Sequence, residues 1–418
     1  MKVLHLSHSD GGSGAGRAAH RIHTSFRDAG VDSKMLVSQK RTSDISVEPI
    51  ARDAVGRLRN RVYEYLEAKV SQNLAVSSSE FLSFSHFSLF EPQKHFWVQE
   101  ADVIVSYWVN GAFATPENLA SLSKPLIWRL SDCWPFTGGC HYHGNCDRFE
   151  FACGSCPKLR FPSPSDASHK LWARKRVLWR SLDLTVVTPS HWMATLARRS
   201  SLFADRRIEV IPTGVDLTVY RPIDRSSARK RWGIPENKLV IAFGAMSPED
   251  DRRKGYDKLK DALHLVSRSS LASEVWAVTF GSNSFQPEDL PVDSVSLGRL
   301  ESDEELVSAY NLADVIVVPS LEDNLPNMAL EAIACGTPIV AFDVCGMPDI
   351  VRDQCNGRLV NVEEQDSLGR AILEMLSDLE QLSIMRTNAR EHAEKNFSLR
   401  DQAHAFLSLC EQVGQGHH

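Results

Sequence analysis

The sequence predicts an α/β protein made of two doubly wound, Rossmann-like domains. Short apolar runs of strand length alternate along the chain with longer amphipathic helical patterns, which is typical of parallel sheets covered by helices on both faces. The chain has 418 residues. Because a single hydrophobic core stops growing at roughly 250 to 300 residues, we expect one parallel sheet in each half.

The composition narrows the class of protein. A hydrophobic content of 43% and a charged content of 24% are ordinary for a globular protein, and the net charge of -6 argues against a nucleic-acid binder. The first residues lack the basic region and the length of a signal peptide, and no apolar run approaches the length of a membrane span. We expect a cytoplasmic protein, and peripheral attachment at the inner face of the membrane stays open.

Each half supplies its own series of strands. Those of the first sheet are predicted at residues 3–7, 33–37, 103–107, 126–130, 184–188 and 208–211. Those of the second are predicted at residues 239–243, 275–280, 315–318 and 338–342, separated by helical patterns such as 256–266 and 303–312. The proline- and glycine-containing segment 212–222 predicts the linker between them.

The domain boundaries follow from these series. We predict an N-terminal domain over residues 1–212, with a cysteine-rich loop at 131–165, and a C-terminal domain over 213–395. Within 396–418, the helical pattern 399–412 carries an apolar face, which we expect to return to the N-terminal domain. The last three residues, Gly416 to His418, are interpreted as the remnant of an expression tag.

The segment 320–338 reads SLEDNLPNMALEAIACGTP and follows a buried-looking strand. A loop at the carboxyl end of a parallel strand lies where α/β folds bind ligands, and the start of the next helix presents free N–H groups to an anion. Asp323 in the turn and Glu331 on the helix can accept hydrogen bonds from sugar hydroxyls. The alternative is a helix with a solvated acidic cap.

This segment resembles the E-x7-E signature of retaining GT-B glycosyltransferases, family 4 in particular, with Asp323 in place of the first glutamate. The resemblance implies two domains facing across a cleft. It also implies that Asp323 holds the transferred sugar, with Glu322 sharing the contact, and that Glu331 holds the nucleotide ribose. Asn324 and Leu325 belong to the same donor site.

A second segment of the C-terminal half carries basic residues. It reads GAMSPEDDRRKGYDKLKDA over residues 244–262, and Lys254 resembles the lysine that this family directs at the diphosphate. Where the family often has an arginine after the strand, this chain has Ala245, and we expect Arg253, in preference to Arg252, to replace it. Departing pyrophosphate needs fixed cations. The alternative is a solvated basic loop.

A weaker signal lies at residues 297–300, where Gly298 and Arg299 resemble the family's base-binding turn. That turn uses mainly backbone groups, and we count Arg299 with the nucleotide-binding residues.

The loop at residues 11–16 reads GGSGAG and partly matches the glycine pattern of a dinucleotide site. An NAD oxidoreductase is therefore a rival, but residues 36–40 offer no acidic side chain for a ribose. The resemblance assigns the loop to the interdomain cleft, where Gly12 and Gly14, with Ser13, approach donor phosphates or acceptor.

Asp132 lies at the carboxyl end of the predicted strand 126–130. Many relatives have a histidine before this aspartate, whereas this chain has Ser131. Our hypothesis is that Asp132 orients the acceptor hydroxyl or the donor sugar, while a donor phosphate oxygen takes the proton in a front-face retaining reaction. The alternative is an aspartate that only caps its loop.

Four cysteines follow within seventeen residues. Cys140, Cys146, Cys153 and Cys156 have the spacing C-x5-C-x6-C-x2-C, which can surround a tetrahedral zinc ion and hold a long loop. Disulfides or packed thiols are the alternatives. A catalytic zinc ion is not expected, because four cysteines leave no open coordination position.

Two basic amphipathic segments are candidates for contact with a membrane. Residues 52–69 interleave arginines with valine and leucine at helical spacing, and residues 170–180 read KLWARKRVLWR. Either segment can lie on anionic lipid or bind a lipid pyrophosphate. The alternative for each is a helix whose apolar stripe packs on the sheet.

Together these features predict a retaining glycosyltransferase that moves a hexose from a nucleoside diphosphate sugar to a surface-polysaccharide or lipid-linked glycan. No catalytic metal is expected, since the chain contains no D-x-D triplet. Three alternatives remain open: a nucleotide-sugar 2-epimerase, a non-catalytic nucleotide-sugar-binding protein, for which Ser131 and Ala245 argue, and an NAD oxidoreductase.

Overall fold

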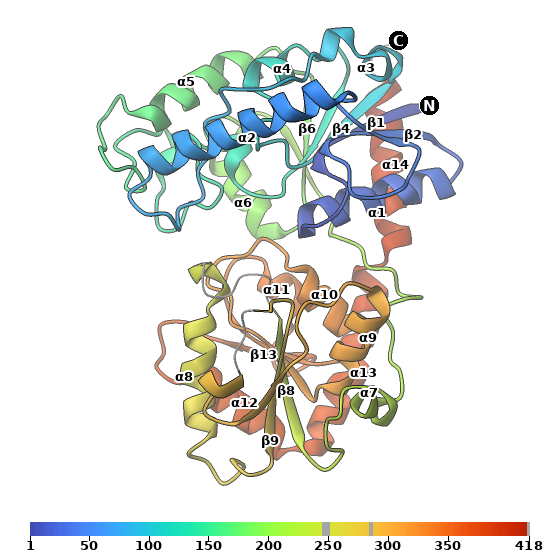
Figure 1. Ribbon diagram of the computed structural model, residues 1–418, viewed down its shortest axis with the longest axis vertical. Coiled ribbons are helices and arrows are strands. Elements are labelled where there is room, and N and C mark those ends of the chain that lie inside the picture. The colour runs from blue at the N-terminus through green and yellow to red at the C-terminus, as the bar shows by residue number, and fades with distance from the viewer. Residues whose placement is uncertain (245–250, 284–286, 416–418) are drawn as a thin grey trace. The chain divides into compact units, whose positions relative to one another are not determined.

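The computed structural model of the chain describes residues 1–244, 251–283 and 287–415. The chain forms two compact units (Figure 1). One contains Met1–Pro212 together with the C-terminal helix from Arg400 onward, and the other contains Thr213–Leu399. Each unit is a parallel sheet with helices packed on it, so the predicted fold class of two Rossmann-like domains is confirmed.

The sheet of the first unit has seven parallel strands in the order β3-β2-β1-β4-β5-β6-β7. The strands are β1 (Lys2–Ser9), β2 (Asp32–Gln39), β3 (Val47–Pro49), β4 (Val103–Ser106), β5 (Leu126–Arg129), β6 (Leu184–Thr188) and β7 (Arg207–Val210). The chain direction across the sheet reverses between β1 and β4. Ligands of open α/β sheets bind beside such a point, at the carboxyl ends of the strands.

The helices of the first unit are α1 (Gly14–Asp28), α2 (Ala54–Leu74), α3 (Phe96–Glu100), α4 (Pro116–Ala120), α5 (Ala167–Trp179), α6 (His191–Arg199) and α14 (Leu399–Gln415). Short 3-10 turns lie at Pro92–Lys94, Trp134–Phe136 and Arg148–Glu150. Helix α14 buries Phe406, Leu409 and Cys410 in the same core cluster as Phe26 of α1. The end of the chain therefore completes the core of its first unit.

The sheet of the second unit has six parallel strands in the order β10-β9-β8-β11-β12-β13. The strands are β8 (Leu239–Gly244), β9 (Val275–Phe280), β10 (Asp293–Ser296), β11 (Val315–Val318), β12 (Ile339–Phe342) and β13 (Gly357–Val360). Here the direction reverses between β8 and β11, which are neighbours. The loops after these two strands are thus brought together by the strand order alone.

The helices of the second unit cover both faces of its sheet. They are α7 (Arg225–Arg231), α8 (Tyr256–Val266), α9 (Asp303–Leu312), α10 (Asn327–Ala334), α11 (Met347–Ile350), α12 (Ser367–Ser377) and α13 (Leu379–Asn396), with 3-10 turns η4 (Arg252–Lys254) and η5 (Pro287–Asp289). Along β11, Ile316 and Val318 enter one core cluster while Val315 and Val317 enter the other. A strand buried on both faces must be apolar throughout, as this one is.

The two basic amphipathic segments behave differently. Helix α5 places Trp172 and Trp179 in the core, so its apolar side packs on the first unit, which was one of the two alternatives. Helix α2 does the opposite: its buried residues are the polar Asn60 and Glu67. Packing of an apolar stripe on the sheet is therefore wrong for α2. Among the described residues, no helix is both long and apolar enough to cross a membrane.

Candidate functional site

In the second unit, the loops that follow β8 and β11 bring a cation and a carboxylate together. The Nζ atom of Lys254 lies 2.6 Å from Oδ2 of Asp323. The Lys254 side chain is 36% exposed and the Asp323 side chain 12%. The pair is therefore partly accessible to solvent at the carboxyl edge of the sheet. The predicted phosphate lysine and the predicted sugar-binding aspartate thus occupy one place, at the reversal point of the sheet.

Gly255 makes this approach possible, and sequence reasoning did not single it out. Its φ of 67° lies in the left-handed region, and a Cβ atom there would lie 1.9 Å from the carbonyl oxygen of Pro319. The N–H of Leu321 donates to the carbonyl oxygen of Arg253 at 2.7 Å, which joins the two loops. Only glycine allows both the backbone conformation and the contact. The K-G pair before an amphipathic helix was the available signal.

Arg253 is held beside the lysine. Its guanidinium donates to both carboxylate oxygens of Asp251, at 3.0 and 2.7 Å, which is a bidentate pair. The neighbouring Arg252 is exposed. Ala245, where the family pattern expects an arginine, lies outside the described residues.

Helix α10 carries the second acidic residue of the motif. Glu331 is 2% exposed, and one of its carboxylate oxygens accepts a hydrogen bond from the hydroxyl of Tyr310 at 2.8 Å. Burial, followed by the charge of Glu331, raises the pKa of Tyr310 well above its usual value, so the phenol stays a donor. Tyr310 therefore fixes this carboxylate from α9, a role that nothing in the motif indicated.

The remaining residues of the motif lie next to Asp323 in the chain. Asn324 and Leu325 are buried, and Glu322 is half-buried. The carbonyl oxygen of Asp323 accepts a hydrogen bond from the N–H of Gly346, 3.3 Å away, in the loop after β12. Three successive strand ends of the second sheet, those of β8, β11 and β12, thus meet around Asp323.

The predicted base-binding turn lies at the ends of β9 and β10. The N–H of Arg299 donates to the side-chain oxygen of Asn283 at 2.9 Å, and the N–H of Gly281 donates to the carbonyl oxygen of Gly298 at 2.8 Å. The Arg299 side chain is exposed. The turn is thus a backbone arrangement that Asn283 stabilises, whereas residues 284–286 next to it lie outside the described residues.

In the first unit, the glycine loop connects β1 to α1. Gly12 is exposed with a φ of 74°, and Gly14 is the first residue of α1. The Ser13 hydroxyl caps the helix by accepting from the N–H of Gly16 at 3.1 Å. A Cβ atom on Gly16 would lie 2.6 Å from the hydroxyl oxygen of Ser9, so the loop turns tightly against the strand end.

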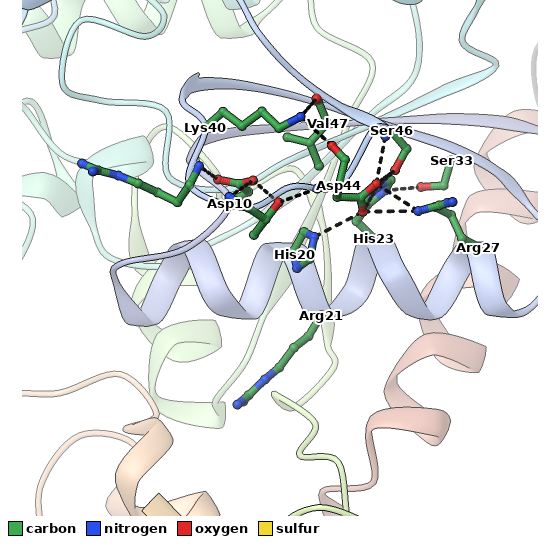
Figure 2. A network of polar contacts seen from close by, with 12 residues as sticks. Asp10, His20, Arg21, His23, Arg27, Ser33, Lys40, Asp44, Ser46 and Val47 are labelled. Carbon is green, nitrogen blue, oxygen red and sulfur yellow. Dashed lines mark hydrogen bonds and ion pairs between the residues drawn. The ribbon is translucent and has the colours of Figure 1, made fainter. Parts of the chain in front are cut away.

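A polar network joins the residue after β1, the loop after β2 and helix α1 (Figure 2). Asp10 accepts from the backbone N–H groups of Arg41 and Thr42, at 2.5 and 3.0 Å, and so ties the end of β1 to the loop after β2. Asp44 contacts Arg27 at 3.1 Å and accepts from the N–H of Ser46 at 2.8 Å. The acids near β2 serve this network, which leaves no free acidic side chain at the end of the strand among the described residues.

Asp132, after β5, is paired with a histidine. Its Oδ2 lies 2.6 Å from Nδ1 of His141, and its Oδ1 accepts from the N–H of Trp134 at 2.8 Å. The other ring nitrogen of His141 lies 2.8 Å from the hydroxyl of Ser83. Both Asp132 and His141 are buried. Sequence reasoning placed His141 only beside the cysteines, although it is the direct partner of Asp132.

The four cysteines of the loop line one cavity. Cys140, Cys146, Cys153 and Cys156 contribute to its wall together with His143. All nine cysteines of the chain are free thiols, and burial raises the pKa of Cys140 and of Cys153 to about 12. Among the described residues, no three metal-binding side chains are placed to hold an ion as they stand. The zinc site therefore stays a prediction.

Solved structures of known proteins share the fold over nearly the whole chain. Sucrose-phosphate synthase of Thermosynechococcus elongatus superposes with a TM-score of 0.68 at 15% identity, covering 100% of both chains. HepE of Anabaena in complex with UDP superposes with a TM-score of 0.64 at 19% identity, covering 99% and 100%. HepE with UDP-glucose gives 0.61 at 20% identity, covering 98% and 99%. The chain has the fold of the GT-B glycosyltransferases.

The second unit is identified more closely. Residues 224–392, which contain Lys254, Asp323 and Glu331, match the family model of glycosyl transferases group 1. The D-inositol 3-phosphate glycosyltransferase of Saccharomonospora viridis is 33% identical over 221 residues, and that of Salinispora arenicola is 36% identical over 213. These matches cover 49% and 46% of this chain. The chain spans about half the length of the curated relatives it matches, 50% and 46%.

Proposed function

We propose that the chain is a retaining glycosyltransferase. It transfers a hexose from a nucleoside diphosphate sugar to a surface-polysaccharide or lipid-linked glycan in the cytoplasm. The observation that carries this proposal is the Lys254–Asp323 pair at the reversal point of the second sheet, within the segment that matches the family model of glycosyl transferases group 1. The matching family segment makes a transferase a better conclusion than a 2-epimerase or an NAD oxidoreductase.

The donor's diphosphate is bound by positive groups at this edge. Helix α10 begins at Asn327 after Pro326, without a side-chain cap, and the positive end of its dipole favours an anion at this edge of the sheet. In the proposed complex, Lys254 leaves the carboxylate of Asp323 for the diphosphate. Arg253 adds a second positive charge nearby. Negative charge grows on the diphosphate as the glycosidic bond breaks, so these cations stabilise the transition state more than the ground state.

The acids bind the sugars of the donor. Once Lys254 is engaged by phosphate, Asp323 is free to accept hydrogen bonds from hydroxyls of the hexose. Glu331, oriented by Tyr310, accepts from the ribose. Asn324, Leu325 and the turn with Arg299 complete the donor site, and Gly12 and Gly14 approach the phosphates from the first unit.

In the proposed reaction, Asp132 orients the acceptor hydroxyl or the donor sugar. A donor phosphate oxygen takes the proton of the acceptor hydroxyl, and the new glycosidic bond forms on the face from which the nucleotide departs. The tight hydrogen bond to His141 supports a role for Asp132 in positioning, because it holds the carboxylate in one orientation.

Donor binding is tested first by thermal unfolding with UDP-, GDP- and ADP-sugars, since a ligand of the native state raises Tm. UDP-glucose is the leading candidate, because the structural neighbour HepE was solved with it. Transfer is then followed by proton NMR of the product's anomeric centre. Retained configuration supports the proposal, an inverted product contradicts the mechanism, and binding without turnover on any glycan or inositol phosphate acceptor favours the non-catalytic alternative.

The metal requirement gives a further test. The sequence has no D-x-D triplet, so we expect transfer to survive treatment with a chelator. Activity that the chelator abolishes and manganese restores would count against the assignment.

Separately from catalysis, we retain the proposal that Cys140, Cys146, Cys153 and Cys156 hold a structural zinc ion. The shared cavity supports it, although these side chains would have to move closer together on binding. Metal analysis of protein purified without a histidine tag decides the matter, because less than half an equivalent of zinc excludes the site.

A further inference from the structure

Helix α2 exposes its apolar face. Val55, Leu58, Val62, Tyr65 and Leu66 are between 37% and 68% exposed. Their spacing of three and four residues puts them on one side of the helix, where they form a continuous stripe. A surface helix of a globular protein normally turns such a stripe toward the core. We call these five residues the α2 stripe.

Polar contacts on the opposite side of α2 hold it in this orientation. The Glu67 carboxylate accepts hydrogen bonds from the backbone N–H groups of Ser85, at 3.1 Å, and of Phe87, at 2.7 Å. Glu64 accepts from the side chain of Gln39 at 3.0 Å, and Asn60 donates to Ser38 at 2.8 Å. Rotating α2 to bury the stripe would expose or break all of these bonds. The exposed stripe is therefore built into the fold.

The charges of α2 are separated in the same way. Its two acidic residues, Glu64 and Glu67, lie on the inner side and are hydrogen-bonded. Its four basic residues are all exposed: Arg57, Arg59, Arg61 and Lys69. At 3.6 residues per turn, Arg59 and Arg61 fall on opposite flanks of the stripe. In the described part of the chain, neither of them has a carboxylate partner.

We propose that α2 binds the surface of a bilayer that contains anionic lipid, with the α2 stripe in the interfacial region and the flanking arginines on lipid phosphates. An apolar stripe bordered by basic residues matches the two layers of such a surface, acyl chain below and negative headgroup above. A second protein surface would have to offer both an apolar groove and acidic borders. The inference does not depend on the glycosyltransferase proposal.

Helix α5 supplies the contrast within the same unit. It is also rich in basic residues, but its tryptophans are buried and Val177 is a single exposed apolar residue, 69% exposed. A lone apolar side chain among charges lacks the area that interfacial binding needs. Val177→Gln is therefore a matched control for substitutions in the α2 stripe.

The test is co-sedimentation of the full chain with vesicles of phosphatidylcholine alone and of phosphatidylcholine with phosphatidylglycerol. We expect the protein to pellet with the anionic vesicles, to stay in solution with the neutral ones, and to be released at high salt. The double variant Leu58→Gln/Val62→Gln and the double variant Arg59→Glu/Arg61→Glu should each lower the partition coefficient at least tenfold. Val177→Gln should leave it unchanged.

Three results would overturn the inference. The first is wild-type protein that stays in solution with both kinds of vesicle. The second is pelleting that the two double variants do not reduce. The third is a dimer in light scattering that Leu58→Gln/Val62→Gln converts to a monomer, since the stripe would then be an interface between copies. The variants are exposed substitutions, and circular dichroism with thermal unfolding confirms that each is folded.

Discussion

The ammonium group of Lys254 lies 2.6 Å from a carboxylate oxygen of Asp323, although 69 residues separate them in the chain. The two residues are held at the ends of neighbouring strands, β8 and β11, where the strand order of the second sheet reverses. In the proposed reaction, Lys254 binds the diphosphate and Asp323 binds the sugar, but here their opposite charges are paired with each other. Donor binding must therefore break this ion pair and replace both partners.

Replacing either member of the pair should lower the rate of sugar transfer. Lys254→Met removes a cation that stabilises the leaving diphosphate, and we expect kcat/KM to fall by about 10²- to 10³-fold. Asp323→Asn leaves the size of the side chain unchanged and should lower kcat by a similar factor. Steady-state kinetics with a saturating acceptor measures both effects.

Lys260 provides the matched control for Lys254. It is also 36% exposed and pairs with an aspartate, Asp257, 3.4 Å away, but it lies on the outer surface of α8. Lys260→Met should leave kcat/KM within a factor of two, since an exposed ion pair contributes at most about 1 kcal/mol to stability. Equal losses in Lys254→Met and Lys260→Met would contradict the assigned role of Lys254.

Gly255→Ala should disturb the donor site more than its backbone conformation alone explains. An alanine with a left-handed φ costs about 1 to 2 kcal/mol, and here the new Cβ atom would also meet the carbonyl oxygen of Pro319. Gly233 has the same φ of 67° but open space around its Cβ position. We expect Gly255→Ala to lower Tm and weaken donor binding, whereas Gly233→Ala lowers Tm only slightly. Indistinguishable melting curves and donor affinities would refute the close-contact argument.

Asp132 and His141 should act as a unit. Asp132→Asn keeps an acceptor for the N–H of Trp134 but loses the charge that faces His141, and His141→Gln loses the ring that orients the carboxylate. We expect each variant to lower turnover at saturating donor at least tenfold, with donor affinity unchanged. The double variant should be little worse than either single one, because partners in one contact are not additive. Near-normal turnover in Asp132→Asn would exclude a role for this residue in transfer.

Stability of the first unit should fall as the pH is lowered. His23 is buried between the hydroxyls of Ser33 and Ser46, and burial, opposed in part by Asp44, lowers its pKa from 6.5 to about 4. Below pH 6.5, His23 binds a proton in the unfolded chain but stays neutral in the folded chain. Folding stability is therefore lost as the pH falls toward 4, by up to about 3 kcal/mol. Burial also lowers the pKa of His5, which adds to the loss.

Denaturant unfolding at several pH values between 7.5 and 4.5 measures this slope. In His23→Gln the side chain no longer titrates, so the free energy of unfolding should depend less steeply on pH, whatever its value at pH 7.5. Asp44 does not add to this loss of stability between pH 7.5 and 4.5. Its pKa is lowered, so the stability that it contributes is lost only when the pH falls below the usual pKa of an aspartate. A variant with the wild-type slope would show that His23 is not responsible.

Much of the fold was predictable because its signals are local. The apolar runs at residues 103–107, 126–130 and 184–188 overlap β4, β5 and β6, since strands buried on both faces must be apolar. The edge strands β3, β10 and β13 were not predicted. Their sequences are short and partly polar, and an edge position needs fewer apolar side chains.

By itself, the sequence determined the fold class and the residue types of the candidate donor site, because strand length, helix periodicity and the spacing around Asp323 and Glu331 are properties of short segments. Only the tertiary structure decided which groups meet. It paired Lys254 with Asp323, Glu331 with Tyr310 and Asp132 with His141, because strand order brings together loops that are distant along the chain. It also turned α2 outward: the hydrogen bonds that Glu67 accepts and Asn60 donates hold the polar side of the helix inward, whereas periodicity alone would place its apolar stripe in the core.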